Sequence, residues 1–352
     1  VILIRLIKPF IHIRWIKSSR SDRIGIFFSG IEHYLSLRDF NSEKNKKTID
    51  LFYFNFISNE YLLEKLNEKI IILNPILIRL LVQADKIVQL FIGKNNTHEI
   101  DNEITSKDLK GLVHKYAPHI EFTQHENEEG KKFLKNLGVQ RDEKYLCLLV
   151  RDSAYLNEYF PGYDWSYHSY RDSNIKNYSS GIKYLLDEGY WIIRMGKATN
   201  QKLDISHERL IDYSLSEYKS DFFDIWLMAN CYFCISTGAG LDEVARVFKI
   251  PTLYINYWSI LDWKSFHQSV TFPKYIKYKD SKKSLSFSEY LDFSFIRTEE
   301  YEKKNIEILE LSSKDIKDAM MEMHEMVNNK WILKSEDLEI QKKFQTIIQK
   351  HL

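Results

Sequence analysis

The sequence has few cysteines, no excess of charge of either sign and no long apolar run, and each absence excludes a class of protein. Fifty lysines and arginines nearly balance 49 acidic residues, which leaves a net charge of +1. A general nucleic-acid binder would carry a marked basic excess, so we expect no nucleic-acid partner. No apolar run approaches the ~20 residues that a membrane-spanning helix needs. The 352 residues suffice for two domains of ordinary size.

The three cysteines, Cys147, Cys231 and Cys234, fall in or beside apolar segments that we expect to be strands. The last two form a Cys-x-x-Cys pair, a spacing that also occurs at redox and zinc sites. Residues three apart in a strand point to opposite faces, so the two sulfurs should diverge. We therefore expect buried free thiols, as in a cytosolic protein, and no metal site.

The most informative stretch, 231–257, reads CYFCISTGAGLDEVARVFKIPTLYINY. It combines an apolar strand at 232–235, a helical apolar spacing at 241–248 and a second strand at 252–256. This order predicts a right-handed βαβ unit of a parallel sheet. The turn between the first strand and the helix consists of small residues only: Ser236, Thr237, Gly238, Ala239 and Gly240.

Such a turn would present free backbone N–H groups and a positive helix end at the carboxyl edge of the sheet, where phosphates bind. The turn matches neither the G-x-G-x-x-G fingerprint nor a Walker loop. An ordinary tight turn, with glycines present for packing, therefore stays open as the alternative.

Strand and helix patterns alternate along both halves of the chain, which predicts an α/β fold class. The first half alternates from residue 10 to about residue 91, and the second from 145 to 256. We expect two Rossmann-like, doubly wound domains that face each other across a cleft. Their predicted extents are 1–125 and 126–330, followed by a C-terminal helix, 331–352, that crosses back to the first domain.

Cationic side chains follow the strands of the second half. Arg151 comes directly after the apolar strand 145–150, and Arg194 and Lys197 flank the end of the next strand. Carboxyl ends of parallel strands meet at one edge of a sheet, so these cations should gather near the small-residue turn. Arginine offers bidentate geometry to phosphate and lysine a point charge. The pattern predicts a phosphate site, although each residue alone is equally consistent with an ordinary surface cation.

The segment 151–173, RDSAYLNEYFPGYDWSYHSYRDS, interrupts the regular pattern. Loops of this length are usually functional lids or binding loops, or are disordered. Its many aromatic residues argue against disorder, and aromatic faces are surfaces on which sugar rings stack. A loop that packs on its own aromatic side chains is the alternative.

The first 17 residues, VILIRLIKPFIHIRWIK, are apolar and basic. On a helix, Arg5, Lys8 and His12 share one face, as on a helix that lies at an anionic membrane surface. Pro9 interrupts such a helix, so an edge strand followed by a first core strand is the alternative. The charges break the apolar core that a signal peptide requires, and we expect none here.

Several segments together resemble a known family. They are LLVRDSAYLN, YHSYRDSNIKNY, LLDEGYWIIRMGK, SDFFDIWLMANCYFCISTGAGLDEVARVFKIP, LYINY and the early IHIRWIKSSRSDRIGIFFSGIEHYL. These segments, which span most of residues 10–257, look like the glycosyltransferases encoded with bacterial surface-polysaccharide genes. That family resembles GT-B glycosyltransferases, with two Rossmann-like domains and the nucleotide-sugar donor in the C-terminal one. It is distantly similar to heptosyltransferases and fucosyltransferases.

The resemblance implies a glycosyltransferase that moves a sugar from a nucleotide-sugar donor to a bacterial surface glycan, a polysaccharide or lipopolysaccharide. The acceptor would be a glycan or a lipid-linked glycan. We expect no cofactor beyond the nucleotide sugar as co-substrate, no metal, and a cytoplasmic protein at the cytoplasmic face of the inner membrane. Two alternatives stay open: a nucleotide-sugar epimerase or phosphorylase on the same fold, and a non-catalytic glycan-binding or assembly subunit.

The same resemblance assigns roles to the candidate residues. Residues that would hold the donor diphosphate and stabilise the charge of the leaving nucleotide are Arg151, Ser153, Arg194, Lys197, Ser236, Thr237, Gly238, Ala239 and Gly240. Residues that would contact the donor or acceptor sugar are Trp165, His168, Tyr170 and Arg171. The base that takes the acceptor proton would come from the N-terminal domain, either Glu32 or Asp22.

Overall fold

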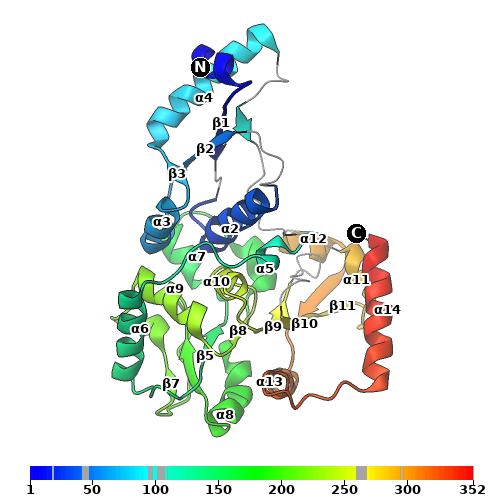
Figure 1. Ribbon diagram of the computed structural model, residues 1–352. Helices are drawn as coiled ribbons and strands as arrows, with labels where there is room; N and C mark the ends of the chain where they lie inside the picture. The colour runs from blue at the N-terminus through cyan, green and yellow to red at the C-terminus, as the bar shows by residue number, and fades with distance from the viewer. Residues whose placement is uncertain are drawn as a thin grey trace.

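A computed structural model describes residues 1–17, 20–41, 47–93, 98–100, 108, 110–258, 268–293, 295 and 297–351. Two parallel sheets form the centres of two domains, one above the other in Figure 1. The predicted α/β class with two doubly wound units is therefore confirmed. No helix within the described ranges is long and apolar enough to cross a bilayer.

The N-terminal domain contains a four-stranded sheet with the order β3-β2-β1-β4, in which every pair is parallel. The alternating pattern that begins near residue 10 corresponds to β1, which starts at His12. The elements of this half are α1 (Ile2–Ile7), β1 (His12–Lys17), α2 (Ile24–Phe40), β2 (Thr48–Tyr53), α3 (Glu60–Asn67), β3 (Ile71–Ile72), α4 (Pro75–Ile92), β4 (Glu99–Ile100) and α5 (Leu112–Lys115).

The C-terminal domain contains a six-stranded sheet with the order β10-β9-β8-β5-β6-β7, and all of its strand pairs are parallel. Its elements as far as the last of these strands are α6 (Gln124–Asn136), β5 (Tyr145–Leu149), α7 (Ala154–Tyr159), the 3₁₀ helices η3 (Ser166–Arg171) and η4 (Ile175–Tyr178), α8 (Ser179–Asp187), β6 (Trp191–Arg194), β7 (Leu210–Ile211), η5 (Tyr213–Leu215), α9 (Asp221–Asn230), β8 (Cys234–Ser236), α10 (Asp242–Val247), β9 (Thr252–Tyr257) and β10 (Ser269–Pro273).

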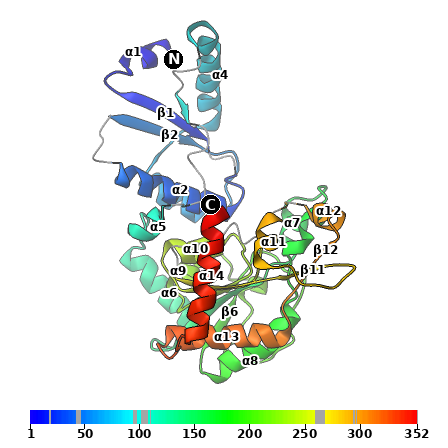
Figure 2. The ribbon, with the colours of Figure 1, turned by 90° about the vertical axis from the view of Figure 1, so that its right-hand side faces the viewer.

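A two-stranded antiparallel sheet and the last helices complete the chain. They are β11 (Tyr275–Tyr278), α11 (Phe287–Asp292), α12 (Thr298–Lys303), β12 (Ile306–Leu309), α13 (Ser313–Val327) and α14 (Ser335–His351). The last helix, α14, packs beside α11, and the ring centroids of Phe287 and Phe344 lie 4.6 Å apart (Figure 2). Its predicted return to the N-terminal domain stays a prediction.

Strand β5 shows how the sequence builds two layers around the C-terminal sheet. All five of its residues are buried, and side chains alternate between the faces of a strand. Cys147 and Leu149 join the core under α9 and α10, while Leu146 and Leu148 join the core under α8 and α13. A strand covered on both faces has no polar side, which is why this segment reads as a continuous apolar run.

The three cysteines are free and buried, as predicted. The prediction that the sulfurs of Cys231 and Cys234 diverge is wrong, because Cys231 lies at the end of α9 and not in a strand. All three thiols therefore belong to the same core cluster, the one under α9.

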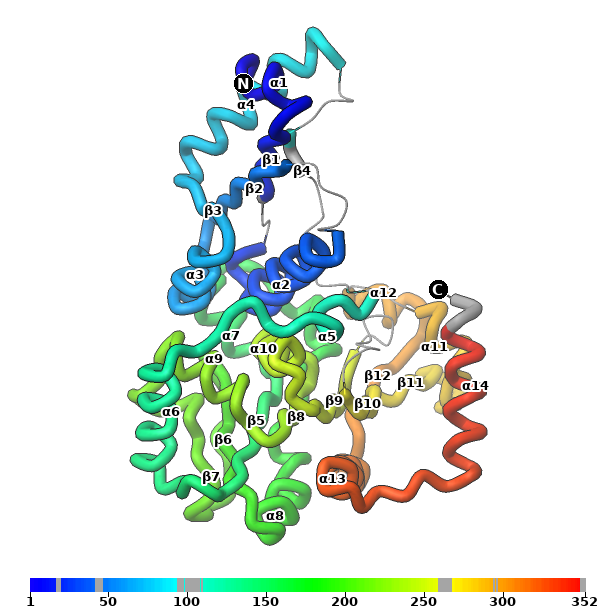
Figure 3. The backbone as a smooth tube through the Cα atoms, viewed as in Figure 1, coloured from blue at the N-terminus to red at the C-terminus, as the bar shows by residue number. Residues whose placement is uncertain are grey.

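The two domains meet where α2 packs on α10 and on the turn before it. Phe28 and Ile31 of α2 belong to one core cluster with Val244 and Val247 of α10. The connecting segment between α5 and α6 runs along the same boundary (Figure 3). A shared apolar core therefore joins the two domains at this boundary, in addition to the covalent connection between them.

Backbone meets backbone at the start of α2. A Cβ atom added to Gly25 would lie 2.9 Å from the Cα atom of Gly240, and one added to Gly240 would lie 3.1 Å from the amide nitrogen of Gly25. A side chain at Gly25 would force the two backbones apart, and one at Gly240 would make a tight contact. Gly240 is thus required for contact between the domains, which is the packing role that the sequence left open for the turn.

Glu32, one of the two predicted bases, is enclosed in the boundary between the domains. Its carboxylate is 1% exposed and accepts hydrogen bonds from the backbone N–H and the ring Nδ1 of His119, at 3.2 and 2.9 Å. The other ring nitrogen of His119 lies 3.0 Å from Asp39. This placement corrects the expectation that Glu32 faces the cleft: it ties α2 to the segment between α5 and α6.

We predict that Gly25→Ala lowers the free energy of unfolding by about 1–3 kcal/mol, because the added methyl group overpacks the contact with Gly240. Chemical denaturation measures this loss. Arg38→Ala, at an exposed position of the same helix, is the matched control and should change stability by less than about 0.5 kcal/mol. Equal effects of the two substitutions would contradict the proposed contact.

The pair of Glu32 and His119 predicts a pH dependence of stability. Burial alone would lower the pKa of His119, but the hydrogen bonds and charges of Glu32 and Asp39 raise it above its ordinary value. A raised pKa means that the fold stabilises the protonated form of His119. This stabilisation is complete at pH values below the unfolded-state pKa of about 6.5, and it is lost as the pH rises through the folded-state pKa.

We therefore expect His119→Gln to destabilise the protein more at pH 6 than at pH 9, as measured by denaturation at both pH values. His125→Gln, at an exposed position of α6, is the control and should follow the wild type at each pH. If the loss of unfolding free energy caused by His119→Gln instead grows as the pH rises, the pKa of His119 is not raised in the folded state and the proposed role of the pair is wrong.

Candidate active site at the domain boundary

The small-residue turn lies at the carboxyl edge of the C-terminal sheet, between β8 and α10, as predicted. Its backbone N–H groups, however, are largely occupied. The hydroxyl of Ser236 accepts hydrogen bonds from the N–H groups of Gly238 and Ala239, at 3.0 and 3.3 Å, and donates to Asp242 at 2.6 Å. The N–H of Thr237 donates to the carbonyl of Leu149. This corrects the expectation of a turn with free amides.

The turn instead holds two arginines. The hydroxyl of Thr237 accepts from the backbone N–H of Arg151 at 2.9 Å, and the carbonyl of Gly238 accepts from the guanidinium of Arg171 at 3.2 Å. Gly238 has a positive φ of 82°, and a Cβ there would lie 2.9 Å from the ring of Tyr257. Glycine is therefore needed at this position for its conformation and its packing, and the turn acts as a support for cationic side chains.

The loop before α2 faces this edge from the N-terminal domain. The guanidinium of Arg23 lies over the rings of Phe160 and Trp165, 4.9 and 5.1 Å from their centroids. Asp22 forms ion pairs with Arg20 at 3.2 Å and with Arg23 at 3.3 Å, and its side chain is 20% exposed. Asp22 and Arg23 are thus brought to the carboxyl edge of the C-terminal sheet, whereas Glu32 is enclosed deeper in the boundary.

Four arginines from both domains, Arg20, Arg23, Arg151 and Arg171, lie near enough to His168 for their charges to act on it; we call them the arginine cluster. Burial and the charges of these four residues lower the pKa of His168 to about 4, so its ring is neutral at pH 7. The Nδ1 atom of His168 is buried and has no hydrogen-bond partner among the residues that the structure describes. Burial and the nearby charge of Arg171 also lower the pKa of Arg151 to about 10.

Few acidic groups offset this positive charge. Asp172 forms an ion pair with Arg151 at 3.3 Å, and Asp22 pairs with the two arginines of its own loop. A desolvated cluster of like charges is costly unless an anion binds to it. The depressed pKa of Arg151 reflects that cost, and it makes the boundary between the domains a strong candidate for anion binding.

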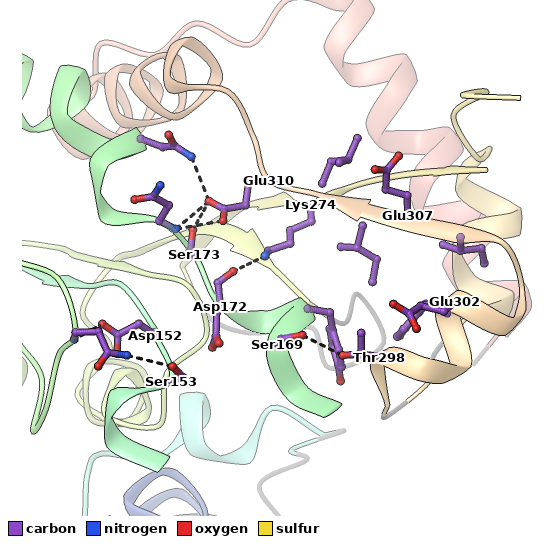
Figure 4. Close-up of a pocket in the computed structure, with 18 of the residues that line it drawn as sticks. Asp152, Ser153, Ser169, Asp172, Ser173, Lys274, Thr298, Glu302, Glu307 and Glu310 are labelled. Atoms are coloured by element: carbon purple, nitrogen blue, oxygen red, sulfur yellow. Dashed lines mark hydrogen bonds between the residues drawn. The ribbon is translucent and has the colours of Figure 1, made fainter. Parts of the chain in front are cut away.

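A polar cavity of about 770 Å³ adjoins the arginine cluster at the same edge of the sheet (Figure 4). Asp172 connects the cavity to the arginine cluster, because it lines the cavity and forms an ion pair with Arg151. The buried Lys274 donates to the carbonyl of Asp172, and Glu310 accepts from Ser173 at 3.0 Å. Hydroxyl, amide and carboxylate groups dominate the lining, a composition that suits a ligand rich in hydroxyl groups.

The remaining predicted residues divide between the cavity and its surroundings. Ser153 lines the cavity and accepts from the side chain of Asn200 at 3.1 Å. Tyr170 also lines it and packs 5.3 Å from the ring of Tyr301. Lys197 is exposed and donates to the carbonyl of Ser58 in the N-terminal domain at 3.4 Å. These three residues therefore lie near the domain boundary or at the cavity beside it.

Arg194 lies elsewhere, and its prediction as a diphosphate ligand is corrected. It is 2% exposed, and its guanidinium donates to Asp212 at 3.1 Å, to Thr199 at 2.8 Å and to the carbonyl of Gln201 at 2.6 Å. These partners satisfy the side chain inside the domain. Arg194 therefore braces the loop after β6 and is omitted from the proposed site.

The aromatic segment 151–173 is not one long loop, because it contains the helices α7 and η3. Its rings pack on one another, with Tyr163 and Trp165 at 4.5 Å and Tyr155 and Tyr159 at 5.0 Å between centroids. The alternative of a segment packed on its own aromatics is therefore correct. Trp165 nevertheless also contacts Arg23 across the boundary.

The fold brings to the site several residues for which no role was predicted from the sequence. Arg20 and Arg23 stand in the basic loop before α2, and that basic character was the available signal. Lys274 comes from a segment without a clear pattern, and no sequence feature marks it. Among the described residues, no group of three or more histidine, cysteine or acidic side chains is arranged to hold a metal ion. Independence from metal stays a prediction.

Comparisons with known proteins extend the description of the fold. No protein-family model matches the sequence, and no curated protein sequence matches it either. Among solved structures, the chain is similar to a glycosyl transferase of family 9 from Veillonella parvula, with a TM-score of 0.50 and 9% identity over 88% of this chain and 96% of that one. The ADP-heptose lps heptosyltransferase II of Escherichia coli gives a TM-score of 0.45 and 14% identity over 74% and 89%.

The similarity to the family 9 structure covers nearly the whole of both chains, so it includes both sheets and the connection between them. Two parallel doubly wound domains with a ligand edge between them are the defining features of the GT-B architecture that the sequence predicted. The chain has a GT-B-like fold.

Proposed function

We propose that the protein is a glycosyltransferase that uses a nucleotide-sugar donor. The arginine cluster carries this proposal, because it gathers cationic side chains from both domains at the carboxyl edge of the C-terminal sheet, around the neutral, unpaired Nδ1 of His168. Ligands of doubly wound domains bind at this edge. A diphosphate supplies the negative charge that the cluster lacks.

The diphosphate would be held mainly by side chains. The turn anchors the backbone of Arg151 and the guanidinium of Arg171, Asp172 pairs with the guanidinium of Arg151, and Arg23 approaches from the opposite domain. Guanidinium groups bind phosphate oxygens with paired hydrogen bonds. In sugar transfer, negative charge grows on the leaving nucleotide, and fixed cations in a water-poor site stabilise that charge without reorganising. The cluster thus favours departure of the nucleoside diphosphate.

The donor sugar would extend from the diphosphate towards the polar cavity. Asp152, Ser153 and Asn200 form a hydrogen-bonded group at its rim, with the N–H of Asn200 donating to Asp152 at 2.8 Å. Such groups can exchange their mutual hydrogen bonds for sugar hydroxyls. Trp165 and Tyr170 would flank the sugar with aromatic surface.

Asp22 is the base that we propose for the acceptor hydroxyl. It stands in the loop of the N-terminal domain that faces the arginine cluster, and it is partly exposed, whereas Glu32 is enclosed. Its neighbours Arg20 and Arg23 would orient the carboxylate. The acceptor would then enter between the loop before α2 and the cavity, and a bacterial surface glycan or a lipid-linked glycan is the acceptor class that we propose.

A glycosyltransferase with the same fold supports this proposal, and the resemblance of the sequence to glycosyltransferases of surface-polysaccharide gene clusters supports it independently. The deciding experiment incubates the protein with a panel of nucleotide sugars, with and without glycan acceptors, and measures free nucleoside diphosphate. Release that depends on the acceptor is expected. An epimerase would change the sugar without release, and a non-catalytic subunit would release nothing.

We predict that Arg151→Ala weakens binding of a nucleoside diphosphate at least tenfold, because a charge-assisted contact contributes roughly 1.5–3 kcal/mol. Lys197→Ala, at an exposed position of the domain boundary, should weaken binding of the nucleoside diphosphate by a smaller factor. Isothermal titration calorimetry measures both affinities. Arg141→Ala, an exposed arginine far from the turn in the sequence, is the matched control and should bind as the wild type does. Unchanged affinity for both test variants would remove the proposed diphosphate site.

We predict that Asp22→Asn lowers the catalytic rate by roughly 10²–10⁴-fold, because the acceptor proton then has no base. Binding of the nucleoside diphosphate should be equal or tighter, because the substitution removes a negative charge beside Arg20 and Arg23. Steady-state kinetics and calorimetry separate the two effects. Near-normal turnover in this variant would show that the proton is taken by another group.

A further inference from the structure

Apolar side chains are exposed on two helices of the N-terminal domain, α1 and α4. The exposed apolar residues, which we call the α1–α4 surface, are Ile2, Leu3, Leu6, Phe10, Ile76, Leu77, Leu80, Ile87, Leu90, Phe91 and Ile92. Leu90 and Phe91 are the most exposed, at 82% and 83%. Contiguous exposed apolar residues on this scale mark an interaction site.

Helix α4 has two apolar faces, and the residues that the structure describes cover only one of them. Ile78 and Val82 are buried against the core of the N-terminal domain, together with the carboxylate of Asp85. Ile76, Leu80, Ile87 and Phe91 follow each other at helical spacing on the opposite side and are exposed. Burial within its own domain therefore does not account for the composition of this helix.

Helix α1 is attached to the covered side of α4. Arg5 of α1 donates to Asp85 of α4 through its Nε atom at 3.0 Å, and Ile4 packs on the core cluster that contains Ile78. Figures 1 and 2 show both helices at the end of the N-terminal domain that is farthest from the C-terminal domain. That end is free of contact with the second sheet in both views.

Basic side chains border the apolar residues. The charges of Arg5 and Asp85 cancel in their ion pair. The other charged residues of α1, its C-cap and α4 are Lys8, Arg79 and Lys86, and all three are basic. Arg79 and Lys86 are exposed and stand two turns apart on one flank of the apolar face of α4.

We propose that the α1–α4 surface binds the surface of a bilayer that contains anionic phospholipids, with α4 lying in the plane of the interface. An apolar face flanked by lysine and arginine is the pattern of interfacial helices, in which apolar side chains enter the acyl boundary and cations contact the headgroups. A second copy of the chain fits less well, because two such surfaces face to face would oppose their like charges.

This inference goes beyond the proposed function, because it concerns a surface away from the candidate site. It also extends the sequence prediction, which assigned membrane contact to the first 17 residues alone. With the N-terminal domain on the bilayer, the loop that carries Asp22 belongs to the membrane-bound half of the molecule.

Flotation of the whole protein with lipid vesicles, without donor or acceptor, tests the proposal. Vesicles of phosphatidylethanolamine with phosphatidylglycerol are compared with vesicles of phosphatidylcholine alone. We expect strong binding to the anionic vesicles and weak binding to the neutral ones. Leu90→Asn combined with Phe91→Asn should weaken vesicle binding roughly tenfold or more, because less apolar surface enters the interface. Ile332→Asn, which changes an equally exposed residue of the C-terminal domain, should leave it unchanged.

The charge contribution has its own test. Lys86→Glu should weaken binding to the anionic vesicles by about fivefold or more and leave binding to neutral ones nearly unchanged. Lys131→Glu, on the exposed side of α6, is the charge-matched control and should bind as the wild type does.

Two results would overturn the proposal. One is an absence of vesicle binding by the wild type, or equal binding by the wild type and the Leu90 and Phe91 double variant. The other is a wild type that does not bind vesicles but forms a dimer in sedimentation velocity, together with a double variant that loses this dimer. That result would assign the surface to a second copy of the chain. Neither result depends on transferase activity, so failure of this proposal is distinguishable from failure of the proposed function.

Discussion

The contact between the backbones of Gly25 and Gly240 sets the distance between the two domains. Helix α2 begins directly on the turn that supports Arg151 and Arg171, with no side chain between the two backbones. The loop that carries Asp22 and Arg23 immediately precedes α2, so the same contact determines how closely these residues approach the C-terminal edge. A larger residue at either glycine would move the loop with Asp22 and Arg23 away from the C-terminal edge. It would also open the apolar core that the two domains share.

The second constraint is electrostatic. The arginine cluster is assembled from both domains and is only partly compensated by Asp22 and Asp172. Burial of Arg151 and the aromatic rings beside Arg23 reduce the exposure of these two cations to water, which strengthens the repulsion between them. The contact of α2 with the C-terminal domain holds them together against that repulsion. His168 remains neutral beside these charges. Unlike the arginines, its ring can accept as well as donate a hydrogen bond.

The sequence predicted the features that depend on local pattern. The continuous apolar run of β5, the unit β8–α10–β9 and the position of Arg151 after a strand all follow from rules that act over a few residues. It failed where a distant partner decides the outcome. Glu32 is enclosed because His119, 87 positions later, reaches its carboxylate, and Arg194 is satisfied by a loop that no periodicity describes.

The turn shows the same limit at smaller scale. Its residue types indicated exposed amides, but the orientation of one hydroxyl, fixed by Asp242, occupies two of them. The polar cavity could not be predicted at all, because its walls come from β12, η3 and the loops after β5 and β6, which only the tertiary fold brings together.

The bond between Glu32 and His119 has a mechanical consequence. It joins the middle of α2 to the segment that connects the domains, while the start of α2 rests on the turn before α10. A motion that preserves both attachments must carry α2 along with the C-terminal domain. The same helix also packs on its own sheet, where Phe27 contacts Phe54 and Tyr34 contacts Phe52. Helix α2 is therefore the element through which the first sheet and the second domain are mechanically coupled.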